Sequence, residues 1–216
     1  MREAFRQRLA NLEEQVLRMG GKVEEAIGLA VRSLVERDLN LAQRVIDQDD
    51  EIDRLEMEIE RESLALLALQ QPLASDLRVV GTALKIITDL ERMADHAVDI
   101  AKTTKRLGGE PLIKPLIDIP RMAELAQTMT HEALEAFVQR DVALAASVIR
   151  RDDVLDSLYH QVFRELLLLM MEDHRTITQG TYLLFVARYL ERIADHATNL
   201  GERTIYMVTG ERSEIK

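Results

Sequence analysis

Apolar residues recur along this chain at intervals of three, four or seven, which is the spacing of one face of an α-helix. The pattern is clearest in three stretches. They contain Leu41, Val45, Ile52, Leu55, Ile59, Leu66 and Leu69, then Val80, Leu84, Ile87, Ala94, Val98 and Ala101, and then Leu144, Val148, Leu155, Leu158, Val162 and Leu169. Each stretch predicts a helix with one face to bury, and short turns allow three such helices to pack against one another.

Residues that end helices are sparse, so the breaks between helices stand out. The breaks lie at Arg37 to Asn40, Gln70 to Ser75, Gly108 to Pro120, Arg140 to Asp141 and Glu172 to Thr176. They leave six helices. Abundant Ala, Leu, Glu, Arg and Met, with only nine Gly, four Pro and 4% aromatic residues, agree with an all-α fold. Inside the first helix, the adjacent Gly20 and Gly21 predict a weak point.

The chain contains an internal duplication. DLERMADHAVD at residues 89–99 returns as YLERIADHATN at residues 189–199, and the first two helices repeat with an offset of 103 residues. The offset falls to 100 for the last helix, so three residues are missing near the second inner turn. This pattern predicts two tandem, pseudo-symmetric three-helix bundles, in residues 1–108 and 109–216, joined by LGGEPLIKPLIDIP.

Composition and charge narrow the function. An apolar fraction of 47% is enough for a core, while a formal net charge of −10 and a pI of about 5.1 disfavour a nucleic-acid-binding surface. An acidic surface suits cations and basic partners instead. The lack of cysteine removes disulfides, thiolate metal sites and cysteine nucleophiles, and it fits a reducing cytoplasm.

The sequence offers no segment that predicts export or membrane insertion. The N-terminal stretch MREAFRQRLANLEEQV alternates charged and apolar residues, unlike a signal peptide. The run LLLLMM at residues 166–171 is far shorter than the roughly 20 apolar residues of a membrane helix. We therefore expect a cytoplasmic protein that meets a membrane only from its surface or through a partner.

Pairs of acids spaced by four residues mark both copies of the duplication. The pairs are Asp49 with Asp53, Glu91 with Asp95, Asp152 with Asp156, and Glu191 with Asp195. Positions i and i+4 lie on one helix face about 6 Å apart, so the two carboxylates of each pair repel unless a cation lies beside them. Arg92, Arg192 or a metal ion can supply that positive charge.

The place of each pair relative to the apolar stripe predicts where its carboxylates lie. Asp49 fills the gap in the stripe between Val45 and Ile52, and Glu91 and Asp152 fill corresponding gaps on their own helices. These positions border the seam between helices, so the two pairs of one unit can converge into four carboxylates. An oxygen-only site of this kind suits Fe³⁺, Mn²⁺, Mg²⁺ or Ca²⁺.

Other residues near the acid pairs have separate expected roles. Asp99 and Asn199 lie one helical turn beyond the pairs and can add metal ligands. His96 and His196 follow the second acid directly, about 100° around the helix, so we expect them to support the site rather than bind the ion. For any single acid pair the alternative is a solvent-exposed helix face, but the repetition of both pairs favours a site.

Motifs for catalysis are lacking in the sequence. It has no glycine-rich phosphate loop after a strand, no evident Ser/His/Asp order and none of the Glu-x-x-His pairs of di-iron helices. We therefore expect a binding protein without catalytic residues. Two alternatives stay open: a metalloenzyme in which paired ions activate water or oxygen, and a purely structural helical scaffold.

Taken together, these motifs resemble the PhoU family of bacterial phosphate-uptake regulators. The resemblance covers essentially the whole chain and rests on the doubled LERxADHA motif, DDEID and DDVLD, the turn QQPLASDLR and the two-unit plan. It implies that metal ions, in multinuclear iron clusters, bind the E(D)xxxD motifs, with manganese, magnesium, zinc or calcium as alternatives to iron. The motifs fall on Asp49, Asp53, Glu91, Asp95, Asp152, Asp156, Glu191 and Asp195.

The resemblance further implies negative control of the phosphate-starvation response when phosphate is plentiful. In this role the protein couples a phosphate ABC transporter to a membrane sensor histidine kinase from the cytoplasmic side, and a homodimer is expected. The chain departs from its own symmetry at Tyr189, opposite Asp89, and at Asn199, opposite Asp99. We therefore expect the second site to hold fewer or different ions than the first.

Overall fold

The computed structural model describes residues 2–70 and 72–211 of the chain. Six α-helices fill most of this range: α1 (Arg2–Glu36), α2 (Leu39–Gln70), α3 (Ala74–Leu107), α4 (Asp118–Gln139), α5 (Val142–Glu172) and α6 (Ile177–Thr209). A short 3₁₀ helix, η1 (His174–Thr176), precedes α6, and no strand occurs in the described ranges. The all-α prediction is confirmed, and each predicted break coincides with a junction between helices; residue 71, inside the second break, is outside the described residues.

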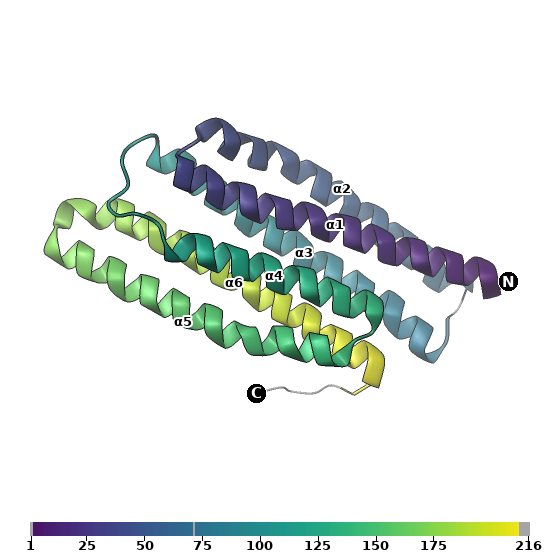
Figure 1. Cartoon of the computed structure of the whole chain (residues 1–216). Coiled ribbons are helices and arrows are strands. Elements are labelled where there is room, and N and C mark those ends of the chain that lie inside the picture. Colours follow the sequence, from purple (N-terminus) through teal and green to yellow (C-terminus); the bar gives the residue numbers. More distant parts are fainter. Residues whose placement is uncertain (1, 71, 212–216) are drawn as a thin grey trace.

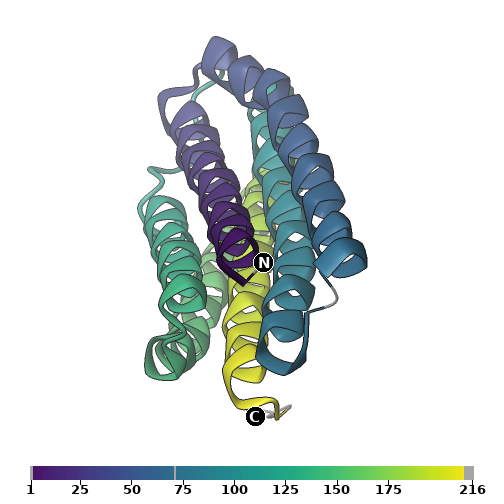
Figure 2. The same cartoon turned by 90° about the vertical axis from the view of Figure 1, so that its right-hand side faces the viewer.

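The helices form two three-helix bundles that lie side by side (Figures 1 and 2). α1, α2 and α3 pack together, and α4, α5 and α6 repeat the arrangement. Across the boundary, α3 packs against α6 and α1 against α4, so α2 and α5 lie on the outer edges. One cluster of buried apolar residues runs through both bundles. Because this core is shared, the division into units at 1–108 and 109–216 stays a prediction.

The predicted apolar stripes face this core. In α2 the stripe is buried from Val45 to Leu66, whereas Leu69 is exposed, so the stripe ends one turn before the helix does. In α5, Val148, Leu155 and Val162 are buried in the same way. No helix in the described part of the chain is both long enough and apolar enough to cross a membrane.

The same tight turn joins the first two helices of each bundle. Arg37 and Arg140 adopt the left-handed conformation, with φ of +56° and +57°. Asp38 Oδ1 accepts hydrogen bonds from two backbone N–H groups at the start of α2, at 2.9 and 3.0 Å, and Asp141 Oδ1 caps α5 in the same way. Such a cap stabilises a helix by about 1 kcal/mol. The repeated Arg-Asp pair of the sequence is therefore a repeated helix start.

Gly20 and Gly21, where the sequence predicts a weak point, lie inside an unbroken α1. A Cβ atom at Gly20 would lie 2.1 Å from Leu134 Cδ1 of α4, whereas one at Gly21 would meet open space. Gly20 therefore allows α1 and α4 to pack closely where the two bundles meet.

Candidate metal centres

The first acid cluster lies on the seam between α2 and α3. Burial, followed by the charges of Asp53 on the same helix and Asp95 on α3, raises the pKa of Asp49 from 3.8 to about 6. Burial also raises the pKa of Glu91, and Asp95 is the next cause. Because these interactions cross the seam, the structure brings the two predicted acid pairs of the first unit together.

One acid of this cluster was missed by the sequence reasoning. Glu56 lies on α2, and burial raises its pKa, with the charges of Glu60 and Asp53 as further causes and that of Asp95 acting across the seam. A signal was present, because Asp49, Asp53, Glu56 and Glu60 follow one another at helical spacing along one face of α2. The first cluster is therefore more acidic than the predicted set of four.

Two arginines lie beside the acid pairs, as the sequence suggested. Arg92 Nη1 is 3.0 Å from Asp95 Oδ2, and its Nε is 3.3 Å from Glu91 Oε2. Arg192 Nη1 is 2.9 Å from Asp195 Oδ2. The two arginine side chains are 58% and 48% exposed, so water screens these ion pairs and each contributes less than about 1 kcal/mol.

The second acid cluster lies on the corresponding seam between α5 and α6. Burial, followed by the charges of Asp156 on α5 and Asp195 on α6, raises the pKa of Asp152 from 3.8 to about 6. Glu191 is only 9% exposed, and burial raises its pKa, with Asp195 as the next cause. The structure therefore brings the four predicted acids of the second unit together as well.

Two carboxylate oxygens of the second cluster have no hydrogen-bond partner among the described residues. They are Asp152 Oδ1 and Glu191 Oε2, both buried. Arg188 pairs with the other oxygen of Glu191, and Arg192 Nε lies 3.9 Å from Oε2, beyond hydrogen-bonding distance. An unpaired buried polar atom costs about 1–3 kcal/mol, and more when it is charged. A cation bound between α5 and α6 would remove this cost.

The acid side chains do not form a finished metal cage. In the part of the chain that the structure describes, no three acidic or histidine side chains are placed to hold one ion. Ion binding would therefore require side chains on facing helices to turn toward each other. The unpaired oxygens and the raised carboxyl pKa values fit a cation, and metal binding stays a prediction.

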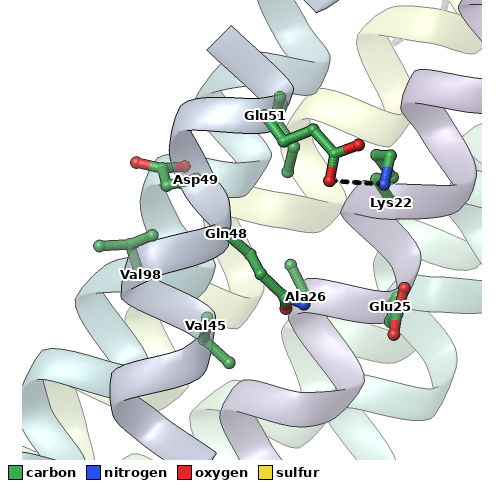
Figure 3. A pocket seen from close by; sticks show the side chains of 9 residues that line it. Lys22, Glu25, Ala26, Val45, Gln48, Asp49, Glu51 and Val98 are labelled. Atoms are coloured by element: carbon green, nitrogen blue, oxygen red, sulfur yellow. Dashed lines mark ion pairs between the residues drawn. The ribbon is translucent and has the colours of Figure 1, made fainter. Parts of the chain in front are cut away.

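A small cavity of about 30 Å³ lies beside the first acid cluster, between α1 and α2 (Figure 3). Lys22 and Glu51 form an ion pair of 2.8 Å at its edge, and Gln48 adds a polar wall. Figure 3 shows the Asp49 carboxylate pointing away from this ion pair, so the cavity adjoins the acid cluster without belonging to it. Its volume and polar walls suit one or two water molecules.

A third polar cluster lies between α3 and α6, where the two bundles meet. Asp89 is 5% exposed there. His196 Nδ1 lies 2.9 Å from Asp89 Oδ1, Arg203 Nη2 lies 2.9 Å from Asp89 Oδ2, and Asn199 donates to Oδ1 at 3.4 Å. One carboxylate of the first bundle is therefore held by three groups of the second. The signal for it in the sequence was the mismatch of Asp89 with Tyr189.

The histidines of the doubled motif also meet at this central seam. The ring centroids of His96 and His196 lie 5.9 Å apart, and His96 stacks on Tyr189 at 5.7 Å. Burial lowers the pKa of His96, and the neighbouring His196 lowers it further. Asp99 is close enough to act on the pKa values of His96 and Tyr189. Asp99 and Asn199 thus lie at the central seam, and their role as metal ligands stays a prediction.

The fold and the acid clusters define a class: an all-helical protein of two similar bundles, each with a paired-carboxylate seam. The chain belongs to the PhoU family, because the family model described as PhoU domain matches it twice, over residues 16–104 and 119–204. The resemblance that the sequence motifs indicated is therefore confirmed.

Relatives match over nearly the whole chain. The phosphate-specific transport system accessory protein PhoU homolog of Clostridium acetobutylicum is 44% identical over 215 residues, covering 99% of this chain and 98% of the relative. The protein of the same name from Aquifex aeolicus is 44% identical over 203 residues, covering 94% and 92%.

Solved structures share the fold. The crystal structure of PhoU from Pseudomonas aeruginosa superposes with a TM-score of 0.91 at 38% identity, covering 96% of this chain and all of that one. The phosphate transport system regulatory protein PhoU from Streptococcus pneumoniae gives a TM-score of 0.91 at 33% identity, covering 98% of this chain and all of that one. These names describe accessory or regulatory proteins, which fits a protein that is not an enzyme.

Proposed function

We propose that this protein is an accessory protein of a phosphate transport system and regulates phosphate uptake. The observation that carries the proposal is the match, over 99% of this chain, to a relative named as a phosphate-specific transport system accessory protein. The central cluster around Asp89 is consistent with a scaffold that holds two binding surfaces in a fixed relation.

The finer role that we propose is that of an adaptor. The protein would bind components of a phosphate ABC transporter and a sensor histidine kinase, on the cytoplasmic side and as a homodimer, and would keep phosphate-starvation genes repressed when phosphate is plentiful. It reaches the membrane through these partners. Membership of the PhoU family supports this role, which binding rather than covalent chemistry would perform.

A deletion strain tests this role. A strain that lacks the gene is expected to express a phosphate-starvation reporter even in phosphate-rich medium, and the wild-type gene on a plasmid should restore repression. Normal repression in the deletion strain would contradict the proposal. Co-purification of the protein with the transporter ATPase and with the kinase tests the two partners separately.

We also propose that each acid seam binds metal ions, with iron as the expected occupant. The residues that would hold them are Asp49, Asp53, Glu91 and Asp95 in the first seam, and Asp152, Asp156, Glu191 and Asp195 in the second. Bound ions would cancel the repulsion between carboxylates and tie each outer helix to its central neighbour. The support in the structure is the pair of buried oxygens without partners on Asp152 and Glu191.

Elemental analysis tests the metal proposal. Protein purified without chelators and without a metal-affinity step should contain stoichiometric metal, and the double variant Glu91→Ala/Asp95→Ala should contain less. Metal-free wild-type protein that takes up no ion from solution would leave the acids as solvated helix faces and would refute the proposal.

A further inference from the structure

An open groove of about 480 Å³ runs between α1 and α4. None of the residues that line it belongs to either acid seam. Figure 1 shows these two helices side by side along one face of the molecule. The walls of the groove include Leu17, Gly21 and Glu24 of α1, and Leu134, Glu135 and Val138 of α4.

Apolar side chains from both helices line the groove. Leu17 is 39% exposed although it is a large apolar residue, and on the facing helix Val138 is half-buried, one turn from Leu134, which is buried in the floor. Gly21 leaves open space where a side chain would stand, which lowers one wall. An open groove between two long helices, with Leu17 on one wall and Val138 on the other, suits a third helix laid along it, with apolar anchors at i, i+3, i+4 and i+7.

The sides of the groove are acidic, and their charges are not neutralised within the described chain. Glu24 has no Lys or Arg partner there and only the exposed His131 beside it, at 3.3 Å. Glu135 accepts a hydrogen bond from Gln139 at 2.7 Å and has no ion pair in the same residues. Burial raises the pKa of Glu24, so an incoming cation would relieve a cost already present. Charge complementarity therefore favours a basic partner.

The internal repeat supplies a natural comparison for this groove. At the offset of 103 residues, Val138 corresponds to Val35, and Glu135 corresponds to Arg32. Arg32 already pairs with Glu36 at 3.1 Å. The acidic character is therefore particular to this end of the α1–α4 pair, because the repeat places Arg32 at the position that corresponds to Glu135.

We propose that the α1–α4 groove is a docking site for a basic amphipathic helix of a partner protein. Leucine-type side chains of that helix would cover Leu17 and Val138 above the buried Leu134, and its lysines or arginines would meet Glu24 and Glu135. The proposal rests on the adaptor role and adds a surface and a partner chemistry to it. It does not depend on metal at the acid seams, which involve other helices.

A peptide-binding experiment tests the docking site. The probe is a fluorescein-labelled helical peptide of 18 residues with Leu at i, i+3, i+4 and i+7 and Lys on the flanking positions. A control peptide has the same sequence with Glu in place of each Lys. Fluorescence anisotropy with the full chain should show binding of the Lys peptide and not of the Glu peptide. The affinity of the Lys peptide should fall roughly tenfold in Val138→Asp and in Glu24→Gln/Glu135→Gln.

Matched variants separate the groove from the acidic surface as a whole. Val35→Asp places the same substitution at the repeat-related position, and Glu110→Gln/Glu172→Gln removes the same charge from exposed acids elsewhere. Both should bind the Lys peptide like the wild type. Circular dichroism checks that each variant is folded, and the isosteric glutamine variants keep the test valid should Val138→Asp not fold.

Three results would overturn the docking proposal. They are no binding of the Lys peptide, equal binding by groove and control variants, and a dimer in sedimentation that only Val138→Asp dissociates, since the occupant would then be a second copy of this chain. Because the assay reads no gene expression, its failure leaves the regulatory role standing. Failure of the deletion test would leave a measured groove interaction intact.

Discussion

Each of the two acid seams contains four predicted carboxylate ligands, but the residues around these carboxylates differ. On α2, Glu56 and Glu60 extend the first cluster, whereas the positions related by the repeat on α5 are Tyr159 and Phe163. Two acids of the first seam are thus replaced by aromatic rings in the second. Duplication has kept the candidate ligands, while the charge around them has changed.

The central helices reinforce this difference. α6 carries Arg188 where α3 carries Thr88. Arg188 pairs with Glu191, and its guanidinium lies 5.8 Å from the centre of the Tyr159 ring. The second seam is therefore less acidic and partly occupied by its own cation, yet it buries two carboxylate oxygens without partners. If the seams bind cations as proposed, we expect charge to favour binding at the first seam and the buried, unpaired oxygens to favour it at the second.

The largest expected effect comes from removing the facing acids of one seam at a time. Glu91→Ala/Asp95→Ala should abolish metal uptake at the first seam, and Glu191→Ala/Asp195→Ala at the second, each leaving the other seam loaded. Metal content after dialysis, measured by elemental analysis, checks this. Loss of all metal in either variant would show that the seams are not separate sites.

The central seam between these two regions gives the next largest effect. Asp89→Ala leaves Arg203 and His196 without their buried partner, and we expect a loss of about 3 kcal/mol in the free energy of unfolding. Asp99→Ala removes the same charge at a position without an ion pair among the described residues and should cost less than about 1 kcal/mol. Urea unfolding curves measure both, and equal losses would contradict the role given to Asp89.

A pH-dependent effect is expected for the metal-free second seam. The pKa of Asp152 is about 6 in the folded protein, against 3.8 for an aspartate in water. The ionised carboxylate therefore destabilises the folded state fully above pH 6. This cost decreases as the pH falls from 6 to 3.8, because the folded protein then binds the proton. Asp152→Asn should therefore stabilise the metal-free protein at pH 7.5 by about 2 kcal/mol and have little effect at pH 4.

The neighbouring acid provides the control for this prediction. Asp153→Asn changes the same charge at an exposed position and should alter the urea midpoint little at either pH. A gain for Asp152→Asn that is equal at pH 7.5 and pH 4 would show that its charge is not the cause.

The smallest expected effect exchanges the residues that distinguish the seams. Glu56→Gln should weaken metal binding at the first seam roughly threefold, since it removes one negative charge from the edge of the cluster. Tyr159→Glu should strengthen binding at the second seam by a similar factor. Isothermal titration with Mn²⁺, on variants with the other seam disabled, resolves the two changes. Stronger metal binding by Glu56→Gln, or weaker binding by Tyr159→Glu, would contradict the effect assigned to the charge around each seam.

Much of the fold was readable in the sequence because its signals are local. The repeated Arg-Asp turn, the sparse breaks and the period of the apolar stripes each depend on residues a few positions apart. The convergence of the acid pairs of α2 and α3 was also readable, since Asp49 and Glu91 fill gaps in two apolar stripes that pack along one seam.

The contacts between the bundles were not readable in this way. The period of a helix shows which face it buries but not which helix of another bundle will cover that face. The Asp89 cluster and the close approach of Gly20 to Leu134 depend on that docking. Glu56 was missed for another reason: it lies one turn beyond the repeated acids, and its counterpart is not acidic.

Anomalous diffraction from crystals soaked in iron or manganese tests the central claim, that both acid seams are cation sites, most directly. We predict anomalous peaks between α2 and α3, beside Asp49 and Asp95, and between α5 and α6, beside Asp152 and Glu191. Metal-loaded crystals that show no peak at either seam, while the acid side chains are well ordered, would contradict the claim.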